Sequence, residues 1–395
     1  MKVLIVAPAD SLHAVRWIER LENNGVECIL YDMTSKERQQ HLGITHIYRT
    51  EARGILPSFC RILDKLGKLG SLFSSSLRIF IDFQSIKVVI KKHKPDLINI
   101  HWLYHHAAIA ASFFGKIPKV TTPWGSDLLV PEYQSPGHSM DKIFHRLLVG
   151  RVVRSADASC CDAVHMKSAL VDFGAKESSV ELIYFGTNTR VFSPQIRSVL
   201  FRSKYGIQED DCVVLSNRQL AAVYDIETLL RAVATIKDRS LNLKLVIVGG
   251  GPEEASLKSK VEELNIGELT IFTGRLNDED FAVATASCDI YVSTSPTDGG
   301  IAASVAEAMS CEAPVIITNF GDNGYWLRDQ SAGLLFESGD HFKLASQIRL
   351  LATNPEKRHE MGKIGRSIIL SENDSELETK KIIELYRRVI SVHKN

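Results

Sequence analysis

The sequence has no long apolar run: none approaches the roughly 20 residues that a membrane-spanning helix needs. Its first residues, from Met1 to Pro8, begin a strand almost at once and lack the segments of a signal peptide. The seven cysteines are odd in number and show no CxxC spacing. We therefore expect reduced, buried thiols in a cytoplasmic protein, and no zinc site.

The chain also has no net charge, with 47 basic and 47 acidic residues, but one segment is strongly basic. In residues 53–94, nine Lys or Arg stand against two acids, Asp64 and Asp82, among interleaved apolar residues. Such a stretch can lie on an anionic membrane surface, or it can form ordinary amphipathic helices with a solvated basic face. A nucleic-acid partner is not expected, because no basic and aromatic stacking platform is evident.

No GxGxxG motif, internal repeat or low-complexity tract occurs, yet apolar strand-like runs alternate with helical patterns along both halves of the 395 residues. This alternation is typical of parallel βαβ sheets, and the length favours two domains. In the first half we expect strands at 3–7, 26–31, 96–101, 119–122, 158–161 and 180–184, with a helix at 12–24. In the second half we expect strands at 212–216, 243–248, 269–272, 290–293, 314–317 and 333–336, and helices at 225–236, 253–265, 278–287, 304–311 and 341–352.

Residues 185–195, which include Gly186, Asn188 and Pro194, predict a hinge. We therefore expect one domain of residues 1–187, joined by a C-terminal helix within 375–395, and a second domain of residues 188–374. Two sheets joined by a hinge would face each other across a cleft. Ligands of open α/β sheets bind outside the carboxyl ends of the strands, so motifs that follow strands should line this cleft.

The most informative motif follows the strand expected at 290–293. It reads Ser295-Pro296-Thr297-Asp298-Gly299-Gly300-Ile301 and leads into a small-residue helix that carries Glu307. Main-chain N–H groups at the start of a helix attract a negatively charged ligand, and paired carboxylates can bind sugar hydroxyls. This combination indicates a nucleotide-sugar site.

Further segments occur in the order seen in retaining glycosyltransferases, and the chain resembles the GT-B group that includes sucrose synthase and the phosphatidylinositol mannosyltransferases, glycosyltransferase family 4 (glycosyl transferases group 1). In the second half the likeness is carried by Asn217-Arg218-Gln219-Leu220, the run from Tyr224 to Ala232, Gly249-Gly250-Gly251-Pro252, Gly274-Arg275-Leu276 and the block from Asp298 to Met309. In the first half it is carried by Ile98-Asn99-Ile100-His101, Thr122-Pro123-Trp124-Gly125-Ser126-Asp127 and the interdomain segment Tyr184-Phe185-Gly186-Thr187-Asn188.

The resemblance implies a GT-B architecture: two Rossmann-like parallel-sheet domains that face each other across a cleft, with the C-terminal helix packing back on the N-terminal domain. It also implies that Arg218 binds the donor diphosphate, as a guanidinium binds phosphate oxygens in pairs. The family usually has a lysine about six residues later, where this chain has Tyr224. Arg275 is the candidate substitute for that lysine.

By the same resemblance, Glu307 holds the two ribose hydroxyls and Gly274, Arg275 and Leu276 contact the base. Asp298 matches the first acid of the family's paired-acid signature, but eight residues separate it from Glu307 where the family has seven. Either the turn carries an extra residue or Gly299 occupies the position, and the first alternative is favoured. Gly299, Gly300 and Ile301 would then offer main-chain N–H groups to the donor.

His101 matches a family histidine that hydrogen-bonds the donor sugar or the developing charge, although a lone histidine at a strand end is more often structural. His101, His105 and His106 could suggest a metal site, but we expect no metal, because the sequence does not place a full set of ligands together. Asp278-Glu279-Asp280 spells a DxD motif, but acids are ordinary in the first turn of a helix. The turn Ala9-Asp10-Ser11-Leu12-His13 lacks the two glycines that the family often has there, although Ser11 and His13 could point into the cleft.

The sequence thus predicts a glycosyltransferase that moves a sugar from a nucleotide-diphosphate-sugar to a hydroxyl acceptor with retention of anomeric configuration, without a metal or other cofactor. Catalysis would rest on His101, Asp298 and Arg218. The acceptor would be a glycan or a lipid-linked glycan, by analogy in surface polysaccharide synthesis, with peripheral binding at the inner face of the cytoplasmic membrane. The alternatives are a nucleotide-sugar epimerase, a non-catalytic glycan-binding subunit and, less favoured, a sugar phosphorylase.

Overall fold

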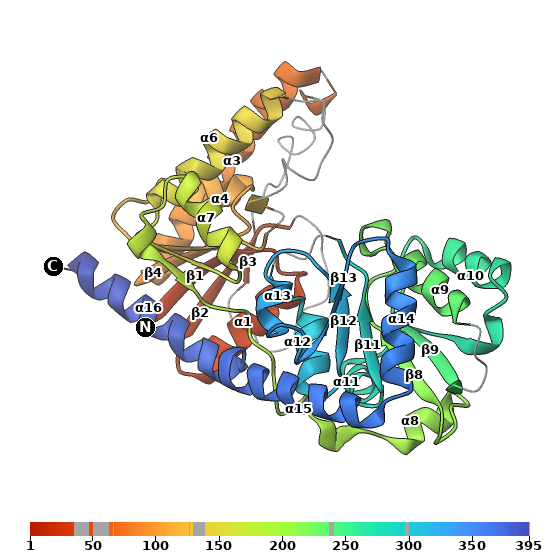
Figure 1. The fold of residues 1–395 in the computed structure, drawn as a ribbon. Coiled ribbons are helices and arrows are strands. Elements are labelled where there is room, and N and C mark those ends of the chain that lie inside the picture. Colours follow the sequence, from red (N-terminus) through yellow and green to blue (C-terminus); the bar gives the residue numbers. More distant parts are fainter. Residues whose placement is uncertain are drawn as a thin grey trace. The chain divides into compact units, whose positions relative to one another are not determined.

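The computed structural model describes residues 1–34, 47–49, 63–65, 67–125, 127–128, 139–236, 241–296 and 300–394. The chain divides into two compact units: unit 1 is Met1–Phe185 with Glu378–Asn395, and unit 2 is Gly186–Leu377. Each unit contains one parallel sheet with helices packed on it (Figure 1). The predicted fold class, two Rossmann-like α/β domains, is confirmed.

The sheet of unit 1 has the order β3-β2-β1-β4-β5-β6-β7, and every pairing in it is parallel. Six of its strands were predicted within a few residues, and the central ones, β1 and β4, are almost wholly apolar or uncharged runs buried on both faces. The strand that the sequence did not predict is the three-residue edge strand β3. The strands are β1 (Lys2–Ala7), β2 (Glu27–Asp32), β3 (Ile47–Arg49), β4 (Leu97–His101), β5 (Lys119–Thr122), β6 (Ala158–Cys161) and β7 (Val180–Leu182).

Alternate residues of each strand in unit 1 face two different cores. Leu4 and Val6 of β1 pack into a core formed with α3, α4, α6 and α7, whereas Val3 and Ile5 pack into a core formed with α1 and α16. Helices therefore cover both faces of the sheet. They are α1 (Leu12–Asn23), α3 (Gly67–His93), α4 (His106–Ala111), α6 (Ser139–Ser155), α7 (Val164–Asp172) and α16 (Ser375–Lys394).

The last helix, α16, packs on unit 1, as the fold class predicted. Its apolar side chains Ile382, Leu385, Tyr386 and Val389 are buried in the core that α1 and β1 share. Near its start, the Glu378 carboxylate accepts a hydrogen bond of 2.7 Å from the main-chain N–H of Tyr184. Burial of four large side chains makes this C-terminal segment an integral part of unit 1.

The sheet of unit 2 has the order β10-β9-β8-β11-β12-β13, again with parallel pairings only. All six strands were predicted within two residues. They are β8 (Cys212–Ser216), β9 (Leu243–Val248), β10 (Thr270–Gly274), β11 (Ile290–Ser293), β12 (Val315–Thr318) and β13 (Gly333–Phe336). The helices are α8 (Val199–Lys204), α9 (Ile226–Thr235), α10 (Glu254–Glu263), α11 (Asp278–Ala286), α12 (Ala303–Ser310), α13 (Asn323–Trp326), α14 (His341–Ala352) and α15 (Pro355–Glu372), with short 3₁₀ turns that include η3 (Ala222–Tyr224).

Both sheets reverse their strand order once. In unit 1 the chain winds outward from β1 through β2 to β3, and from β4 through β5 to β7, so the reversal lies between β1 and β4. In unit 2 it lies between β8 and β11. At such a point the two loops at the carboxyl ends run in opposite directions and leave room for a ligand. The motifs that follow β1, β4, β8 and β11 therefore lie at two defined edges.

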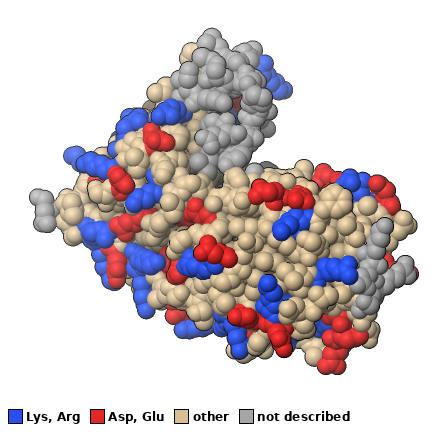
Figure 2. All heavy atoms as spheres, viewed as in Figure 1, with Lys and Arg blue, Asp and Glu red and all other residues tan. Residues whose placement is uncertain are grey.

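Charges of both signs are mixed on one face of the described structure. On the face shown in Figure 2, basic and acidic side chains are interspersed over each unit, in keeping with 47 residues of each sign. Six of the cysteines lie in the described parts of the chain, and all six are buried and free, as predicted. Among the described helices, none combines the length and apolar character needed to span a membrane.

Candidate functional site

Arg218 lies just after β8, at the reversal point of unit 2, and is held by two neighbours. Its Nη1 donates a hydrogen bond of 3.1 Å to the hydroxyl of Ser304, and its guanidinium carbon lies 4.4 Å from the centroid of the Tyr224 ring. A planar guanidinium that is stacked and bonded in this way loses little further freedom when it binds an anion. Tyr224, which stands near the place of the family's lysine, thus supports Arg218 and adds no second charge.

The hydroxyl that Arg218 contacts belongs to the first turn of α12. This helix follows β11, and its N-cap residue, Ala302, makes no side-chain capping hydrogen bond. The first main-chain N–H groups of a helix carry a positive partial charge and bind anions readily. Arg218 and the start of α12 therefore bring two sources of positive potential to one edge of the sheet.

Two predicted residues lie immediately before α12. Gly300 is buried and Ile301 is half-buried. Asp298 and Gly299 lie outside the described residues, so the choice between them for the first acid position stays open. The contribution of all four to donor binding stays a prediction.

The glycine turn after β9 packs directly against the loop that carries Arg218. A Cβ atom on Gly251 would lie 2.2 Å from the carbonyl oxygen of Leu220, and one on Gly249 would lie 3.0 Å from the carbonyl oxygen of Arg218. Gly249 also has a φ of 128°, which side chains rarely allow. Two of the three glycines are thus required by close approach of the main chain.

The same turn lies beside the end of β10. The Gly249 N–H donates a hydrogen bond of 2.9 Å to the carbonyl oxygen of Gly274, and a Cβ atom on Gly250 would lie 3.4 Å from Nε of Arg275. Arg275 is exposed and Leu276, which follows it, is half-buried. The structure therefore brings the loops of Arg218, Gly274 and Arg275 together through the glycine turn.

We expect a Gly251→Ala substitution to destabilise unit 2 by about 1–3 kcal/mol, because the new methyl group would overlap a main-chain oxygen that cannot move freely. The matched control is Gly250→Ala, whose Cβ would meet only the flexible side chains of Arg275 and Glu254, at 3.4 Å or more. Thermal unfolding of both variants is the measurement. Equal midpoints for the two variants would contradict the packing described here.

Glu307 is 5% exposed and lies on α12 one helical turn after Ser304. Residues three apart on a helix project from the same side, so the Glu307 side chain lies on the same side of α12 as Ser304, which contacts Arg218. Every residue of α12 from Ser304 to Ser310 is buried, in keeping with the small residues that flank Glu307. Ribose binding by Glu307 stays a prediction.

His101, at the end of β4 in unit 1, is fully buried and both of its ring nitrogens are occupied. The indole N–H of Trp124 donates to Nδ1 at 3.1 Å, so the neutral ring carries its proton on Nε2 and donates to Oδ1 of Asn99 at 2.7 Å. Burial lowers the pKa of His101 to about 3, so the ring is neutral near pH 7. The predicted bond to a donor sugar would require His101 to give up one of these partners.

The two motifs that had suggested a metal have structural roles. His105 caps α4, since its Nδ1 accepts a hydrogen bond of 3.2 Å from the N–H of Ala107. Asp278 and Asp280 lie in the first turn of α11, as expected, where Asn277 is the N-cap. Within the described residues, no three His, Cys, Asp or Glu side chains are grouped so that they could hold a metal ion.

Two family models match the chain. The one described as "Glycosyl transferase 4-like" matches residues 2–162, and "Glycosyl transferases group 1" matches residues 200–368, which contain Arg218, the glycine turn and α12. The chain belongs to the group 1 glycosyltransferase family. Membership was predicted from the order of motifs in unit 2, and it is confirmed.

Relatives of this group 1 family member are distant. The chain is 24% identical over 311 residues to N-acetyl-alpha-D-glucosaminyl L-malate synthase of Bacillus anthracis. The aligned region covers 78% of each chain. It is 29% identical over 187 residues to putative glycosyltransferase EpsD of Bacillus subtilis, covering 47% of this chain and about half, 48%, of that protein. The structure of Anabaena HepE in complex with UDP superposes with a TM-score of 0.75 at 18% identity, over 97% of this chain and 99% of that one, which shows the GT-B fold.

Sequence reasoning missed the two residues that hold Arg218. Tyr224 was noted only as a departure from the family pattern, and Ser304 only as the start of a helix. The available signal was their position: each begins or precedes a helix that follows a strand at the reversal point. Residues at such positions meet at the carboxyl edge of the sheet.

Proposed function

We propose that this group 1 glycosyltransferase transfers a sugar from a nucleotide-diphosphate-sugar to a hydroxyl acceptor, with retention of anomeric configuration. The observation that carries the proposal is the placement of Arg218 over Tyr224 and against Ser304 at the start of α12. This arrangement suits a diphosphate, whose charge grows when the sugar departs. The complex of HepE with UDP supports a nucleotide donor for a chain of this fold.

In the proposed mechanism unit 2 binds the donor. Arg218, Arg275 and the first N–H groups of α12 stabilise the leaving diphosphate, which they could do without a metal ion. Glu307 accepts hydrogen bonds from the two ribose hydroxyls. The acceptor hydroxyl attacks from the face that the diphosphate leaves, and the departing phosphate oxygen takes the acceptor proton. The carbon–oxygen bond to the diphosphate breaks as the new glycosidic bond forms.

The reaction is tested by incubating the chain with a panel of nucleotide sugars, with and without glycan and lipid-linked acceptors. We expect nucleoside diphosphate release that depends on an acceptor, and a product that keeps the donor's anomeric configuration by NMR. A free sugar epimer formed without acceptor would indicate an epimerase. Donor binding without transfer to any acceptor would indicate a non-catalytic subunit.

We also propose that α3 contacts an anionic membrane surface. Its Phe73, Phe80 and Val88 side chains are 64%, 59% and 66% exposed, and they recur about every two helical turns. Lys87 and Lys91 are exposed on the same helix, whose one acidic residue, Asp82, is buried. Exposed apolar and basic side chains together suit the boundary between lipid head groups and acyl chains.

Replacing Lys91, Lys92 and Lys94 by glutamine should weaken binding to phosphatidylglycerol vesicles at low salt by about tenfold or more, since each lysine near such a surface contributes about 1 kcal/mol. Cosedimentation measures the effect. The control is a Lys258→Gln, Lys260→Gln double variant, because both lysines pair with glutamates on α10. Unchanged vesicle binding by the triple variant would refute the proposal.

A further inference from the structure

A second cluster at a reversal point consists of aromatic side chains in unit 1. His13 follows β1, Trp102 follows β4, Trp124 follows β5 and Phe185 follows β7, so all four lie near the carboxyl edge of one sheet. The ring centroids of Trp102 and Trp124 are 5.6 Å apart, and those of His13 and Trp124 are 5.9 Å apart. The donor site described in unit 2 uses none of these residues.

The two indoles form a corner. Their planes meet at 79°, and both side chains are half-buried, whereas His13 is exposed. Asp10 and Ser11 lie in the same turn as His13, and Ser11 makes no capping hydrogen bond from its side chain to α1. An apolar corner edged by polar groups matches a pyranose ring, which has apolar C–H faces and a rim of hydroxyl groups.

The main chain at Trp102 is held in an unfavourable conformation. Its φ is 54°, a left-handed value that is rare for a residue with a bulky side chain. The buried carboxylate of Asp127 secures the conformation, since one oxygen accepts from the N–H of Leu103 at 2.6 Å and the other from the N–H of Trp124 at 2.8 Å. Asp127 thus ties together the two loops that carry the indoles. Strain that the surrounding structure maintains in this way is typical of ligand sites.

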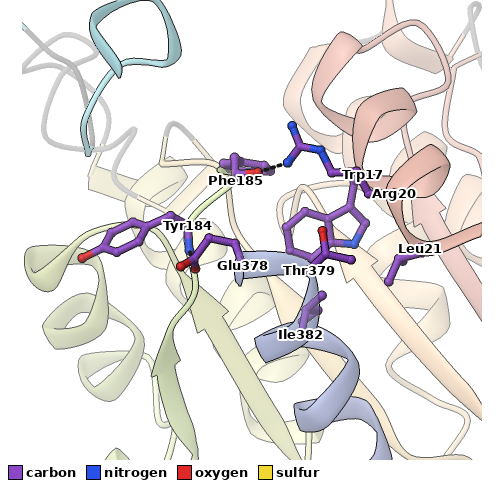
Figure 3. Close-up of a pocket in the computed structure, with 8 residues that line it drawn as sticks. All are labelled: Trp17, Arg20, Leu21, Tyr184, Phe185, Glu378, Thr379 and Ile382. Carbon is purple, nitrogen blue, oxygen red and sulfur yellow. Dashed lines mark hydrogen bonds between the residues drawn. The ribbon is translucent and has the colours of Figure 1, made fainter. Parts of the chain in front are cut away.

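The cluster also has a fixed base. Figure 3 shows a small pocket that Phe185 helps to line, where Arg20 points toward Phe185 and donates a hydrogen bond to its carbonyl oxygen. The neighbouring Tyr184 N–H is bonded to Glu378 of α16. The Phe185 ring lies 5.0 Å from that of His13 and 5.6 Å from that of Trp17, centroid to centroid. The aromatic cluster is therefore supported from two helices, α1 and α16.

We infer that the corner of Trp102 and Trp124, with the polar turn at His13, is a saccharide subsite that binds a pyranose ring of the acceptor. The assignment of this sugar to the acceptor rests on the proposed transferase function. The binding of a saccharide in unit 1 is independent of that proposed function. The ligand class follows from the perpendicular indoles, the polar rim and the position at the reversal point between β1 and β4.

Intrinsic tryptophan fluorescence can report ligand binding at this site selectively. The chain has four tryptophans, and Trp17 and Trp326 are 5% and 0% exposed, so a small solute reaches only Trp102 and Trp124. The probes are methyl glycosides of glucose, galactose, mannose and N-acetylglucosamine at millimolar concentration, with cyclohexanol as a ring that lacks the sugar's set of hydroxyls. We expect at least one glycoside to change the emission saturably and cyclohexanol to have no such effect.

The decisive variant is Trp102→Asn. Asparagine tolerates the left-handed conformation, so the variant should unfold within a few degrees of the wild type but bind the glycoside at least tenfold more weakly. Trp102→Phe keeps an aromatic face and should lose less affinity. The matched control is Asn265→Gly: Asn265 has a φ of 54° and is exposed just after α10 in unit 2, so glycine should be tolerated there without changing glycoside binding.

Three results would overturn the inference: no saturable response to any glycoside, an equal response to cyclohexanol, or unchanged affinity in Trp102→Asn. Nucleoside diphosphate binding, measured on the same samples, tests unit 2 separately and should be the same in wild type and Trp102→Asn. Glycoside binding without any nucleotide binding would keep the saccharide subsite and remove the proposed transferase function. Nucleotide binding without glycoside binding would remove the saccharide subsite and keep the proposed transferase function.

Discussion

Replacing Arg218 by alanine should weaken nucleoside diphosphate binding about 100-fold, which corresponds to about 2.8 kcal/mol. The loss follows from the guanidinium's position against Ser304 and over Tyr224, where it can form paired, charge-assisted hydrogen bonds to phosphate oxygens. Arg218→Lys keeps the charge but loses the planar fork and much of the stacking, so its affinity should be intermediate. Isothermal titration calorimetry with UDP, GDP and ADP measures the effect.

The control for Arg218 is Arg231→Ala. Arg231 lies on α9 in the same unit and pairs with Glu227 in an exposed contact, so its removal should leave nucleotide affinity unchanged. If Arg218→Ala and Arg231→Ala bind as tightly as the wild type, Arg218 is not a diphosphate ligand. If both variants bind the nucleotide more weakly by the same factor, the loss comes from the lower positive charge of the protein and not from a contact with Arg218.

Asn99→Leu should destabilise unit 1 by about 3 kcal/mol or more, because Asn99 is fully buried at the centre of a polar network. Its Oδ1 accepts from Nε2 of His101 and from the hydroxyl of Tyr386, both at 2.7 Å. Its Nδ2 donates to the Thr122 hydroxyl at 2.9 Å and to the Val120 carbonyl at 3.1 Å. Leucine would leave these buried groups without their partner.

Thermal unfolding followed by circular dichroism measures this loss. The control is Asn24→Leu, at the exposed end of α1, where the amide makes one hydrogen bond to the carbonyl oxygen of Arg20. We expect the unfolding temperature of Asn24→Leu to lie close to that of the wild type. An Asn99→Leu variant that unfolds at the wild-type temperature would show that the network does not stabilise unit 1.

Most of the strands were predictable because parallel strands buried on both faces are mainly apolar runs. Edge strand β3 was missed, since three residues are too few to show a pattern. The short helices α4, α8 and α13 were missed for the same reason, and the longer helices α6, α7 and α15 were not predicted either. The reversal points, however, depend on which strands are neighbours, and the alternation of strands and helices does not specify that order.

The site was predictable only in part. Arg218, Gly274, Arg275 and Glu307 end a strand, follow one or lie on the helix after one, which the motif order indicated. The contacts among Arg218, Tyr224 and Ser304 depend on side-chain packing between separate loops. The Tyr386–Asn99 bond joins residues 287 positions apart, and no local pattern reveals such a pair.

The most direct test is hydrogen–deuterium exchange of the whole chain with and without a nucleoside diphosphate, in the wild type and in Glu307→Gln. Bound UDP, GDP or ADP should slow exchange in residues 217–221, 249–251, 274–276 and 300–307 of unit 2. Glu307→Gln removes the charge that we expect to bind the ribose hydroxyls but keeps the size of the side chain, so it should greatly reduce this protection at equal ligand concentration. Protection confined to other segments, or none with any of the three ligands, would contradict a diphosphate site at the edge between β8 and β11.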